Sequence, residues 1–553
     1  MKKVLPTIIA IVLIIAAGIA WMISLVIEWK KPTDERMDGA VYYNMTEADQ
    51  VALVVNDVVS ESFGKKIDGT IYFDYETVKN VINKRFYWDI NEQLMLYALP
   101  TELIKVDLKE AHSDYRMIEN KMYISMDKII EYTDMEYRIL DDPARVVIRN
   151  DWKKVRTAVL QKDSHIRYKG GIKSEILTDV ASGSEIQILD SESFENWAQV
   201  LSPDGYIGYI EKADFGTIQE KDNTHVSQKA EYTSISRESK INMVWHQVTN
   251  QTVNAGIGTL LDGTAGVNVV APTWYFIDDI NGSMVDLSSA QYVEEAHARG
   301  VEVWAVLNDF DGDMASRDST YAVLSKTSAR EKIITTVINS VLQCGADGIN
   351  VDIEKVSATC APHYLEFIRE LSIQCRQRGL VLSTDNYVPT YSGYMDRKEQ
   401  GEIVDYVVIM GYDEHFAGSE EAGSVASLPF VEDGIKRTLE EVPAEKVING
   451  IPFYTRIWKQ DEKGKLSSEA VGMAAAETFV SENGLSKSWD GEVGQNYVEA
   501  TIDNELYRVW MEDAKSVAEK MKLIQSYDLA GVSAWKMGFE TSDIWGVISE
   551  YLQ

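Results

Sequence analysis

From residue 241 to the end of the chain, short apolar runs of β-type residues alternate with amphipathic, helix-type stretches. Eight such runs cover residues 241–248, 267–277, 301–307, 349–353, 380–383, 404–410, 447–451 and 529–534. Eight strand–helix units in about 310 residues favour a closed (β/α)8 barrel, a TIM barrel. A doubly wound open sheet is the alternative. The stretch at about 455–508 is too long for one connection and predicts a small inserted lobe.

The fourth run carries the pattern Asp347-Gly348-Ile349-Asn350-Val351-Asp352-Ile353-Glu354. Residues along a strand alternate between its two faces, so Asn350, Asp352 and Glu354 share one face. We expect this face to point into the barrel and toward its C-terminal, active end. Carboxyls buried side by side raise one pKa, which suits a general acid near neutral pH. The plainer alternative is a charged strand end that caps a helix or pairs with Lys355.

This octet resembles the signature of the family 18 glycoside hydrolases. Met410-Gly411-Tyr412-Asp413 at the sixth strand and Trp535 at the end of the eighth resemble further family motifs. Segments 271–275 and 509–513 resemble the bacterial branch, which includes spore-cortex and peptidoglycan N-acetylglucosaminidases. The resemblance covers about residues 238–553. One departure is Asn350, where many members carry Asp, because an amide cannot share a proton with Asp352.

The resemblance implies a retaining, substrate-assisted hydrolysis that needs no cofactor. Glu354 would be the general acid, Asp352 would hold the substrate's acetamide N–H, and Tyr412 would bind the acetamide oxygen. The other substrate contacts would come from Asn350, Asp413, Trp535, Trp274, Tyr275, Asn386, Trp510 and Glu512. The run Asp385-Asn386-Tyr387 at the fifth strand could form an edge of the cleft. Asp347 and Gly348 would be structural parts of the motif. The aromatic residues of this set could instead be ordinary core residues, and Asp413 could be a loop cap.

Composition narrows the partners. The formal charge is −33, from 54 basic and 87 acidic residues, which argues against nucleic acid because phosphate backbones bind basic surfaces. A neutral amino-sugar glycan fits this charge better than an anionic wall polymer. Three cysteines, at 344, 360 and 375, and seven scattered histidines form no metal-binding spacing and no disulfide framework. The sequence therefore predicts no metal site.

The sequence thus predicts hydrolysis next to N-acetylglucosamine in cell-wall peptidoglycan. One alternative is chitinase-type cleavage of chito-oligosaccharides. Another is a non-catalytic glycan-binding surface protein on the same fold, which the presence of Glu354 disfavours.

The N-terminus carries the longest apolar run. Residues 4–27 contain no charge and follow Lys2 and Lys3. As a helix they would span about 36 Å, enough for a bilayer core of about 30 Å. We expect residues 1–31 to be a cytoplasmic stub and an uncleaved transmembrane signal anchor, with the rest of the chain outside the cell membrane. A cleavable signal peptide ending near Gly18-Ile19-Ala20 is the rival interpretation.

Two small domains are expected between this anchor and the barrel. Residues 40–150 mix short β-like runs with a helix and resemble the α+β modules of the copper amine oxidase N-terminal-like kind, without a copper-ligand set. Residues 151–216 alternate short β segments with turns and resemble a bacterial SH3-like barrel. Residues 217–240 are polar and read as a linker, and residues 241–553 would form the barrel with its insertion.

Overall fold

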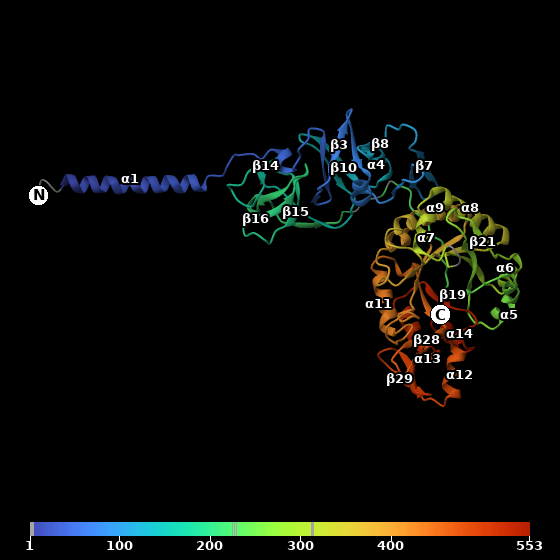
Figure 1. Ribbon diagram of the computed structural model, residues 1–553. Coiled ribbons are helices and arrows are strands. Elements are labelled where there is room, and N and C mark those ends of the chain that lie inside the picture. Colours follow the sequence, from blue (N-terminus) through green and yellow to red (C-terminus); the bar gives the residue numbers. More distant parts are fainter. Residues whose placement is uncertain (1–4, 224, 226, 228, 311–313, 553) are drawn as a thin grey trace. The chain divides into compact units, whose positions relative to one another are not determined.

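The computed structural model describes residues 5–223, 225, 227, 229–310 and 314–552. The chain divides into two compact units (Figure 1). The first holds residues up to 87 together with 107–230, and the second holds residues 88–106 together with 231–553.

The second unit contains a closed parallel barrel of eight strands. The barrel closes because the first strand, β19, hydrogen-bonds to both β20 and the last strand, β32. In order around the barrel the strands are β19 (Ile241–His246), β20 (Val269–Ile277), β22 (Glu302–Asn308), β23 (Gly348–Asp352), β24 (Val381–Tyr387), β25 (Tyr406–Met410), β26 (Val447–Pro452) and β32 (Gly531–Trp535). A short strand, β21 (Met284–Asp286), pairs antiparallel with β20. The predicted barrel is confirmed, and each of the eight apolar runs contributes one strand.

Helices cover the outside of this barrel (Figure 1). They are α5 (Ile257–Asp262), α6 (Ala290–His297), α7 (Arg317–Leu324), α8 (Thr327–Cys344), α9 (Ala361–Arg378), α10 (Arg397–Ile403), α11 (Leu428–Leu439), α13 (Ala514–Ser526) and α14 (Ile544–Tyr551). The longest two, α8 and α9, precede and follow β23. Both end in a left-handed glycine, Gly345 and Gly379, a conformation that glycine adopts without strain.

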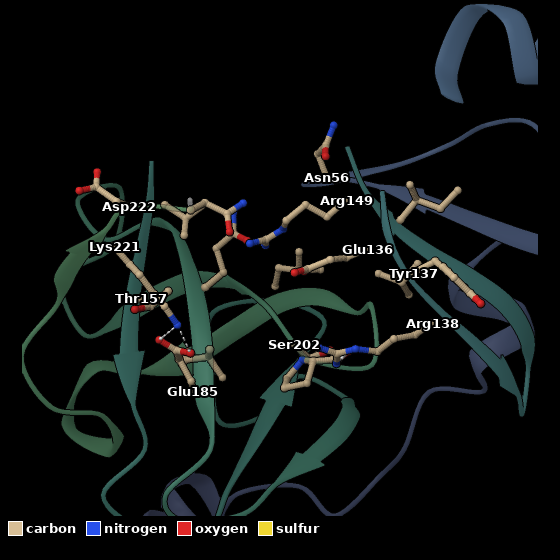
Figure 2. Close-up of a pocket in the computed structure, with 18 residues that line it drawn as sticks. Asn56, Glu136, Tyr137, Arg138, Arg149, Thr157, Glu185, Ser202, Lys221 and Asp222 are labelled. Carbon is tan, nitrogen blue, oxygen red and sulfur yellow. Dashed lines mark hydrogen bonds and ion pairs between the residues drawn. The ribbon is translucent and has the colours of Figure 1, made fainter. Parts of the chain in front are cut away.

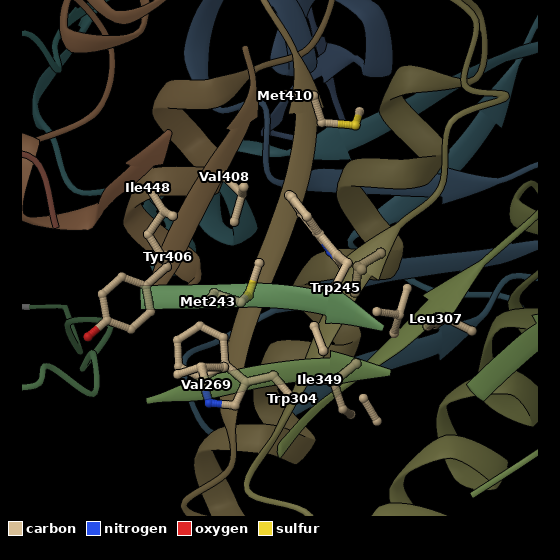
Figure 3. Close-up of a cluster of buried hydrophobic side chains, with 14 of the residues drawn as sticks. Met243, Trp245, Val269, Trp304, Leu307, Ile349, Tyr406, Val408, Met410 and Ile448 are labelled. Atoms are coloured by element: carbon tan, nitrogen blue, oxygen red, sulfur yellow. The ribbon is translucent and has the colours of Figure 1, made fainter. Parts of the chain in front are cut away.

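Large side chains fill the barrel below its active end (Figure 3). The rings of Trp304 on β22 and Tyr406 on β25 stack with centroids 5.4 Å apart. Gly348 on β23 leaves room for this stack, since a Cβ there would lie 3.2 Å from Trp304 and 2.7 Å from the Val381 carbonyl oxygen. The filled interior makes the barrel a packed core, so polar side chains gather only toward the C-terminal ends of its strands.

An inserted lobe lies between β26 and α13 in the sequence. It is a five-stranded antiparallel sheet with one helix packed on it. Its elements are β27 (Tyr454–Gln460), β28 (Leu466–Gly472), α12 (Met473–Glu482), β29 (Ser488–Asp490), β30 (Gln495–Ile502) and β31 (Glu505–Met511).

A segment far from the barrel in sequence packs on its outer helices. It comprises most of the meander β5 (Phe86–Asp89), β6 (Leu94–Ala98) and β7 (Leu103–Asp107). Asp89 accepts hydrogen bonds from the backbone N–H and the hydroxyl of Thr327, at 2.8 and 2.6 Å. Arg376 on α9 donates to the Pro100 carbonyl at 2.9 Å. The second unit is therefore discontinuous in sequence.

The first unit contains two β structures. One is an eight-stranded sheet formed by β1 (Gln50–Val55), β2 (Val58–Val59), β3 (Gly64–Ile67), β4 (Thr70–Asp74), β8 (Tyr115–Ile118), β9 (Lys121–Ser125), β10 (Glu136–Asp141) and β11 (Ala144–Arg149), with the helix α4 (Met126–Tyr132). The other is a seven-stranded sheet formed by β12 (Val155–Val159), β13 (Ser164–Arg167), β14 (Ile176–Val180), β15 (Glu185–Asp190), β16 (Trp197–Leu201), β17 (Ile207–Glu211) and β18 (Gln219–Lys221). Tyr43, Ala52 and Val54 join the core of the second sheet, so the two structures share buried surface.

A cavity of about 520 Å³ lies where these two sheets meet (Figure 2). Glu136 and Arg138 of β10 line one side, and an ion pair between Lys221 and Glu185, 3.0 Å apart, lies on the other. Its lining mixes both signs of charge with apolar side chains, and no single ligand chemistry is favoured by them.

The N-terminal helix α1 (Leu5–Lys30) is long and apolar. Residues 8–30 have a mean hydropathy of 2.8 and none of that segment is buried against the rest of the chain. By length and composition it is the one candidate membrane span in the described residues, and a signal sequence has the same properties.

Candidate active site

The polar residues of β23 point into the barrel, as their alternation predicts. The amide of Asn350 is fully engaged there. Its oxygen accepts from the Trp245 indole N–H at 3.0 Å, and its nitrogen donates to Ser383 Oγ at 2.9 Å and to Asp385 Oδ1 at 2.7 Å. Ile349 and Val351, on the opposite face, are buried in the core. These contacts hold Asn350 in the framework beside Asp385, and its predicted contact with substrate stays a prediction.

Asp352 and Asp385 form a buried carboxyl pair near the active end. Their exposed fractions are 4% and 3%. Burial, more than any other cause, raises the pKa of Asp385 to about 8 and that of Asp352 well above its ordinary value. Each carboxyl raises the pKa of a neighbour further, because like charges in a low-dielectric site repel. Donors from Asn350 and Trp245 offset only part of this effect on Asp385.

Glu354 follows β23 and keeps its side chain 23% exposed. Burial raises its pKa, while a hydrogen bond from Tyr387 and the charge of Lys355 lower it in part. The Tyr387 hydroxyl donates to Glu354 Oε2 at 2.8 Å, and Lys355 Nζ is 3.8 Å from the same oxygen. A carboxyl with a raised pKa and an accessible head can donate a proton and can be stabilised after losing it.

Asp309 fixes the backbone at this strand end. Its carboxylate is fully buried and accepts from the backbone N–H groups of Glu354 at 2.9 Å and Lys355 at 3.1 Å. Thr320 on α7 donates to it at 2.7 Å. Asp309 therefore fixes the backbone from which the Glu354 side chain projects.

Aromatic rings gather around the same end of the barrel. Trp245 lies edge-on to Tyr412, with centroids 6.4 Å apart, and 6.0 Å from Trp535. Tyr412 is buried, and burial together with nearby carboxylates, Asp352 first among them, raises its pKa well above the usual range. Its hydroxyl is thus neutral at physiological pH. The Tyr454 hydroxyl donates to Asp413 Oδ1, which ties that loop to the inserted lobe.

A cavity of about 350 Å³ opens beside Trp535, over the ends of β19, β20 and β22. Its lining combines apolar side chains with a few polar ones: Gln247, Val248, Thr249, Thr273, Phe276, Ile277, Asp278, Val285, Leu287, Phe310 and Trp535. An aromatic face on a cavity of this size suits the apolar face of a sugar ring.

Residues 306–540 match the sequence profile of Glycosyl hydrolases family 18. This stretch of the chain is a family 18 glycoside hydrolase domain. The matched stretch includes the whole of the β23 motif, Tyr412, Asp413 and Trp535. Residues 167–215 match a second profile, the bacterial dipeptidyl-peptidase SH3 domain, which confirms the predicted SH3-like module. The predicted likeness of residues 40–150 to copper amine oxidase N-terminal modules stays a prediction.

Individual proteins resemble the chain over its C-terminal half. The glycosylase YvbX of Bacillus subtilis is 27% identical over 298 residues, which are 51% of this chain and 84% of that protein. The cortical fragment-lytic enzyme of Bacillus subtilis is 24% identical over 279 residues, 49% of this chain and 64% of that protein. The fold is shared with the Bacillus cereus spore cortex-lytic enzyme SleL, at a TM-score of 0.51 and 23% identity, covering 60% of this chain and 78% of SleL. A chitinase from Chromobacterium violaceum gives the same TM-score and identity, covering 57% of this chain and 99% of the chitinase.

Two predicted substrate contacts on β20 lie in the barrel wall instead of in the site. Trp274 and Tyr275 are fully buried in the barrel wall. The Trp274 indole donates to Asn254 at 2.9 Å, and the Tyr275 hydroxyl donates to Ser340 on α8 at 3.0 Å. Both therefore pack against the outer helices, and the alternative interpretation of them as core residues is correct.

Asn386 and Glu512 are also misplaced by the sequence interpretation. The Asn386 amide exchanges hydrogen bonds with Gln400 on α10, at 3.0 and 3.2 Å, on the outer face of β24. Glu512 is 1% exposed and pairs with Lys520 at 3.0 Å, with Gln495 and Ser516 as further donors. Both are structural residues.

The structure also places the three remaining predicted residues, Trp510, Asp347 and Gly348. Trp510 on β31 is half-buried beside Tyr497, with ring centroids 4.9 Å apart, and its contact with substrate stays a prediction. Asp347 accepts from His297 and from the Val303 backbone N–H, each at 2.8 Å. With Gly348, it holds the start of β23 in place, which fits a structural role.

Two residues of the site, Trp245 and Asp309, were missed from the sequence. Asp385 and Tyr387 were read only as a possible edge of the cleft, although a usable signal for their position existed. Alternation along β24 places Ser383, Asp385 and Tyr387 on one face and Asn386 on the other, so the rule that selected Asp352 would have selected Asp385 and Tyr387. Asp309 and Trp245 carry no local signal, because their roles depend on contacts across the barrel.

Proposed function

We propose that this chain hydrolyses the glycosidic bond next to an N-acetylglucosamine residue of cell-wall peptidoglycan. The names of the Bacillus relatives, which act on spore cortex or its fragments, support this substrate class. The SH3-like module and the apolar N-terminal helix fit a protein of the cell envelope. Chito-oligosaccharides are the second candidate substrate, supported by the chitinases among the relatives.

One observation supports the hydrolytic role above the others. Glu354 is a half-buried carboxyl with a raised pKa at the active end of β23, beside the buried Asp352. In this family the substrate's own N-acetyl oxygen attacks the anomeric carbon, so the protein needs a single proton donor. Glu354 protonates the leaving oxygen and afterwards takes a proton from the incoming water. Tyr387 and Lys355 stabilise its carboxylate between these two steps.

The neighbouring groups serve the acetamide and the sugar ring. Asp352 holds the acetamide N–H and faces the positive charge that develops on the ring. Tyr412, whose hydroxyl stays neutral, donates to the acetamide oxygen. Trp535 offers its half-exposed ring as the floor of the sugar site, and Asp413 binds sugar hydroxyls or supports the acid.

The helix α1 is proposed as an uncleaved signal anchor that places both units outside the cell membrane. Its apolar stretch exceeds the usual length of the apolar region in a cleaved signal. Immunoblotting of membrane fractions tests this, since a cleaved signal would give a shorter protein released from the membrane.

The activity is tested by digesting purified peptidoglycan and identifying the new reducing ends by mass spectrometry after borohydride reduction. We expect reduced N-acetylglucosamine at the new ends. Glu354→Gln should keep the fold and lower the rate by at least about 100-fold, the scale of acid–base help. Glu294→Gln, on the exposed face of α6, is the matched control and should cleave like the wild type.

Three outcomes would contradict parts of the proposal. Reduced N-acetylmuramic acid at the new ends would refute the stated linkage. Cleavage of chito-oligosaccharides alone would favour the chitinase alternative. Undiminished cleavage by Glu354→Gln would refute the assigned acid.

A further inference from the structure

Asp352 and Asp385 are cross-strand neighbours on the inside of the barrel. β23 and β24 pair in parallel, with Asn350 opposite Ser383 and Val351 opposite Thr384. One further step along both strands brings Asp352 opposite Asp385. Since Asn350 and Ser383 are hydrogen-bonded inside the barrel, the carboxyls two residues on point the same way. Adjacent strands lie about 4.8 Å apart, so the two carboxyls face each other at short range.

Each of these carboxyls carries one oxygen that is buried without a hydrogen-bond partner among the described residues. These atoms are Asp352 Oδ1 and Asp385 Oδ2. Two facing oxygens of ionised carboxyls would repel each other, whereas one proton between them satisfies both.

The orientation of the Asn350 amide is fixed by chemistry. The Trp245 indole can only donate, so the Asn350 atom that it contacts at 3.0 Å must be the oxygen. The amide nitrogen therefore donates to Asp385 Oδ1, at 2.7 Å, and Asp385 Oδ2 is the oxygen left without a partner among the described residues. Asn350 itself cannot titrate. The carboxyl that neighbours Asp352 is therefore supplied by the next strand, β24.

The surroundings supply little positive charge. The charged groups facing the pair are Asp309, just after β22, and Glu354 and Lys355, just after β23. The other polar groups facing it are the side chains of Tyr387 on β24, Tyr412 just after β25, Tyr364 on α9 and Trp245 on β19. Lys355 is the one cation of this set, and it acts on Asp352 more weakly than burial, Asp385, Glu354 and Asp309 do. With so many carboxyls and one cation, a full second charge on the pair is costly.

We propose that Asp385 is a positioning residue that shares one proton with Asp352 and thereby sets the charge of Asp352 during turnover. This rests on the proposed function. In the resting enzyme the proton lies between Asp385 Oδ2 and Asp352 Oδ1. As positive charge develops on the oxazolinium ring of the substrate, the proton moves fully onto Asp385 and leaves Asp352 as a carboxylate facing that charge. It returns when water opens the ring, so the pair neither gains nor loses a proton over one cycle.

The test compares Asp385→Asn with the swap variant Asn350→Asp/Asp385→Asn. In the single variant the amide at 385 holds Asp352 as a permanent carboxylate. We expect kcat to fall by about 100-fold, with a smaller change in KM, and the pH dependence of kcat to change shape. The swap variant restores a carboxyl beside Asp352 and should recover much of the loss, which a merely structural role for Asp385 would not allow.

Thermal stability gives a readout independent of substrate. When folding raises the pKa of a carboxyl, the free energy of unfolding of the protein falls as the pH rises from the pKa of that carboxyl in the unfolded chain toward its pKa in the folded one. For Asp385 this window runs from about 4 to about 8. Asp385→Asn removes this cost. The Tm of the variant minus the Tm of the wild type should therefore increase as the pH rises through the window. A structural role predicts a lower Tm at every pH.

Several results would contradict the proposed role of Asp385. Wild-type kcat and pH dependence in Asp385→Asn, or a swap variant that folds but stays as inactive as the single variant, would overturn the proposal. Failure of Asp385→Asn to fold would also contradict it, because a neutral side chain should be tolerated there. If the substrate assignment alone is wrong, the pH dependence of the Tm difference will still be seen.

Discussion

Two clusters of buried carboxyls in the barrel unit differ in how their charge is balanced. On the outer helices, Arg330 of α8 pairs with Glu370 of α9 at 2.8 Å, and Arg369 pairs with both Glu366 and Glu399 at 3.1 and 3.0 Å. All of these side chains are nearly or fully buried. Burial raises the pKa of Glu370 to about 7, against an opposing effect of Arg330.

The carboxyls at the ends of β23 and β24 are equally buried, but within the described part of the chain neither forms an ion pair with a guanidinium. Asn350 and Trp245, both neutral, are the donors that lower the pKa of Asp385, which still rises to about 8 from a lower ordinary value. Pairing with a guanidinium turns buried carboxyls into a structural element, whereas leaving them unpaired keeps them able to hold and transfer protons. The presence or absence of a guanidinium partner therefore distinguishes the structural carboxyls on the outer helices from the carboxyls of the candidate site.

Removing a cation from the outer cluster should have the largest effect on stability. Arg330→Met leaves Glu370 buried without its partner and should lower the free energy of unfolding by about 3–5 kcal/mol. Because Glu370 can then protonate, the loss should be larger at pH 8 than at pH 5. Denaturant unfolding at both pH values measures this. A similar loss from Arg437→Met, at an exposed pair on α11, would show that burial of the outer cluster does not make its ion pairs important for stability.

Changing the charge beside Glu354 should have an intermediate effect, on activity. Lys355 lowers the pKa of Glu354, so Lys355→Met should raise it. The alkaline limit of kcat, where the acid loses its proton, should move upward by up to about one pH unit, since solvent screens the half-exposed pair. The pH dependence of peptidoglycan cleavage measures this. A downward movement of that limit would show that Glu354 is not the acid that titrates.

The smallest effect is expected at Asp89, a third kind of buried carboxyl. Its charge is satisfied by the backbone N–H and hydroxyl of Thr327 at the start of α8, and Arg330 also donates to that hydroxyl, at 3.0 Å. Asp89→Asn should cost about 1 kcal/mol, as does the loss of a helix cap. The change in Tm of the full chain measures it, with kcat of the folded protein unchanged. An unaltered Tm would show that the meander of β5–β7 adds nothing to α8.

The sequence was sufficient for the barrel and for one strand of its site. Period-two alternation with apolar neighbours placed Asn350 and Asp352 on the inner face of β23, with Glu354 just beyond its end, because side-chain alternation is a local property of an extended backbone.

The errors at Asn386 and at Trp274 and Tyr275 have different causes. Asn386 lies on the correct strand but on its outer face, where alternation from Asp385 places it. Trp274 and Tyr275 are adjacent, so alternation alone would place one of them inside the barrel, but the register of β20 shifts between Thr273 and Tyr275 and both contact residues outside the barrel.

Other features depend on tertiary contacts that alternation and composition do not show. Glu512 was taken for a cleft residue, but Lys520 on the following helix, α13, pairs with it inside the core. Residues 88–106 were assigned with the first small domain, yet Asp89 contacts Thr327, 238 positions on. Pairings of this range leave no trace in composition or periodicity.

The most direct test of the account is the infrared absorption of protonated carboxyls in the wild type and in Asp385→Asn, followed as the pH rises from 5 to 8. We expect the wild type to keep a protonated carboxyl at neutral pH that loses its proton only near pH 8, and we expect this signal to be absent from the variant. Identical spectra for the two proteins across that range would contradict it.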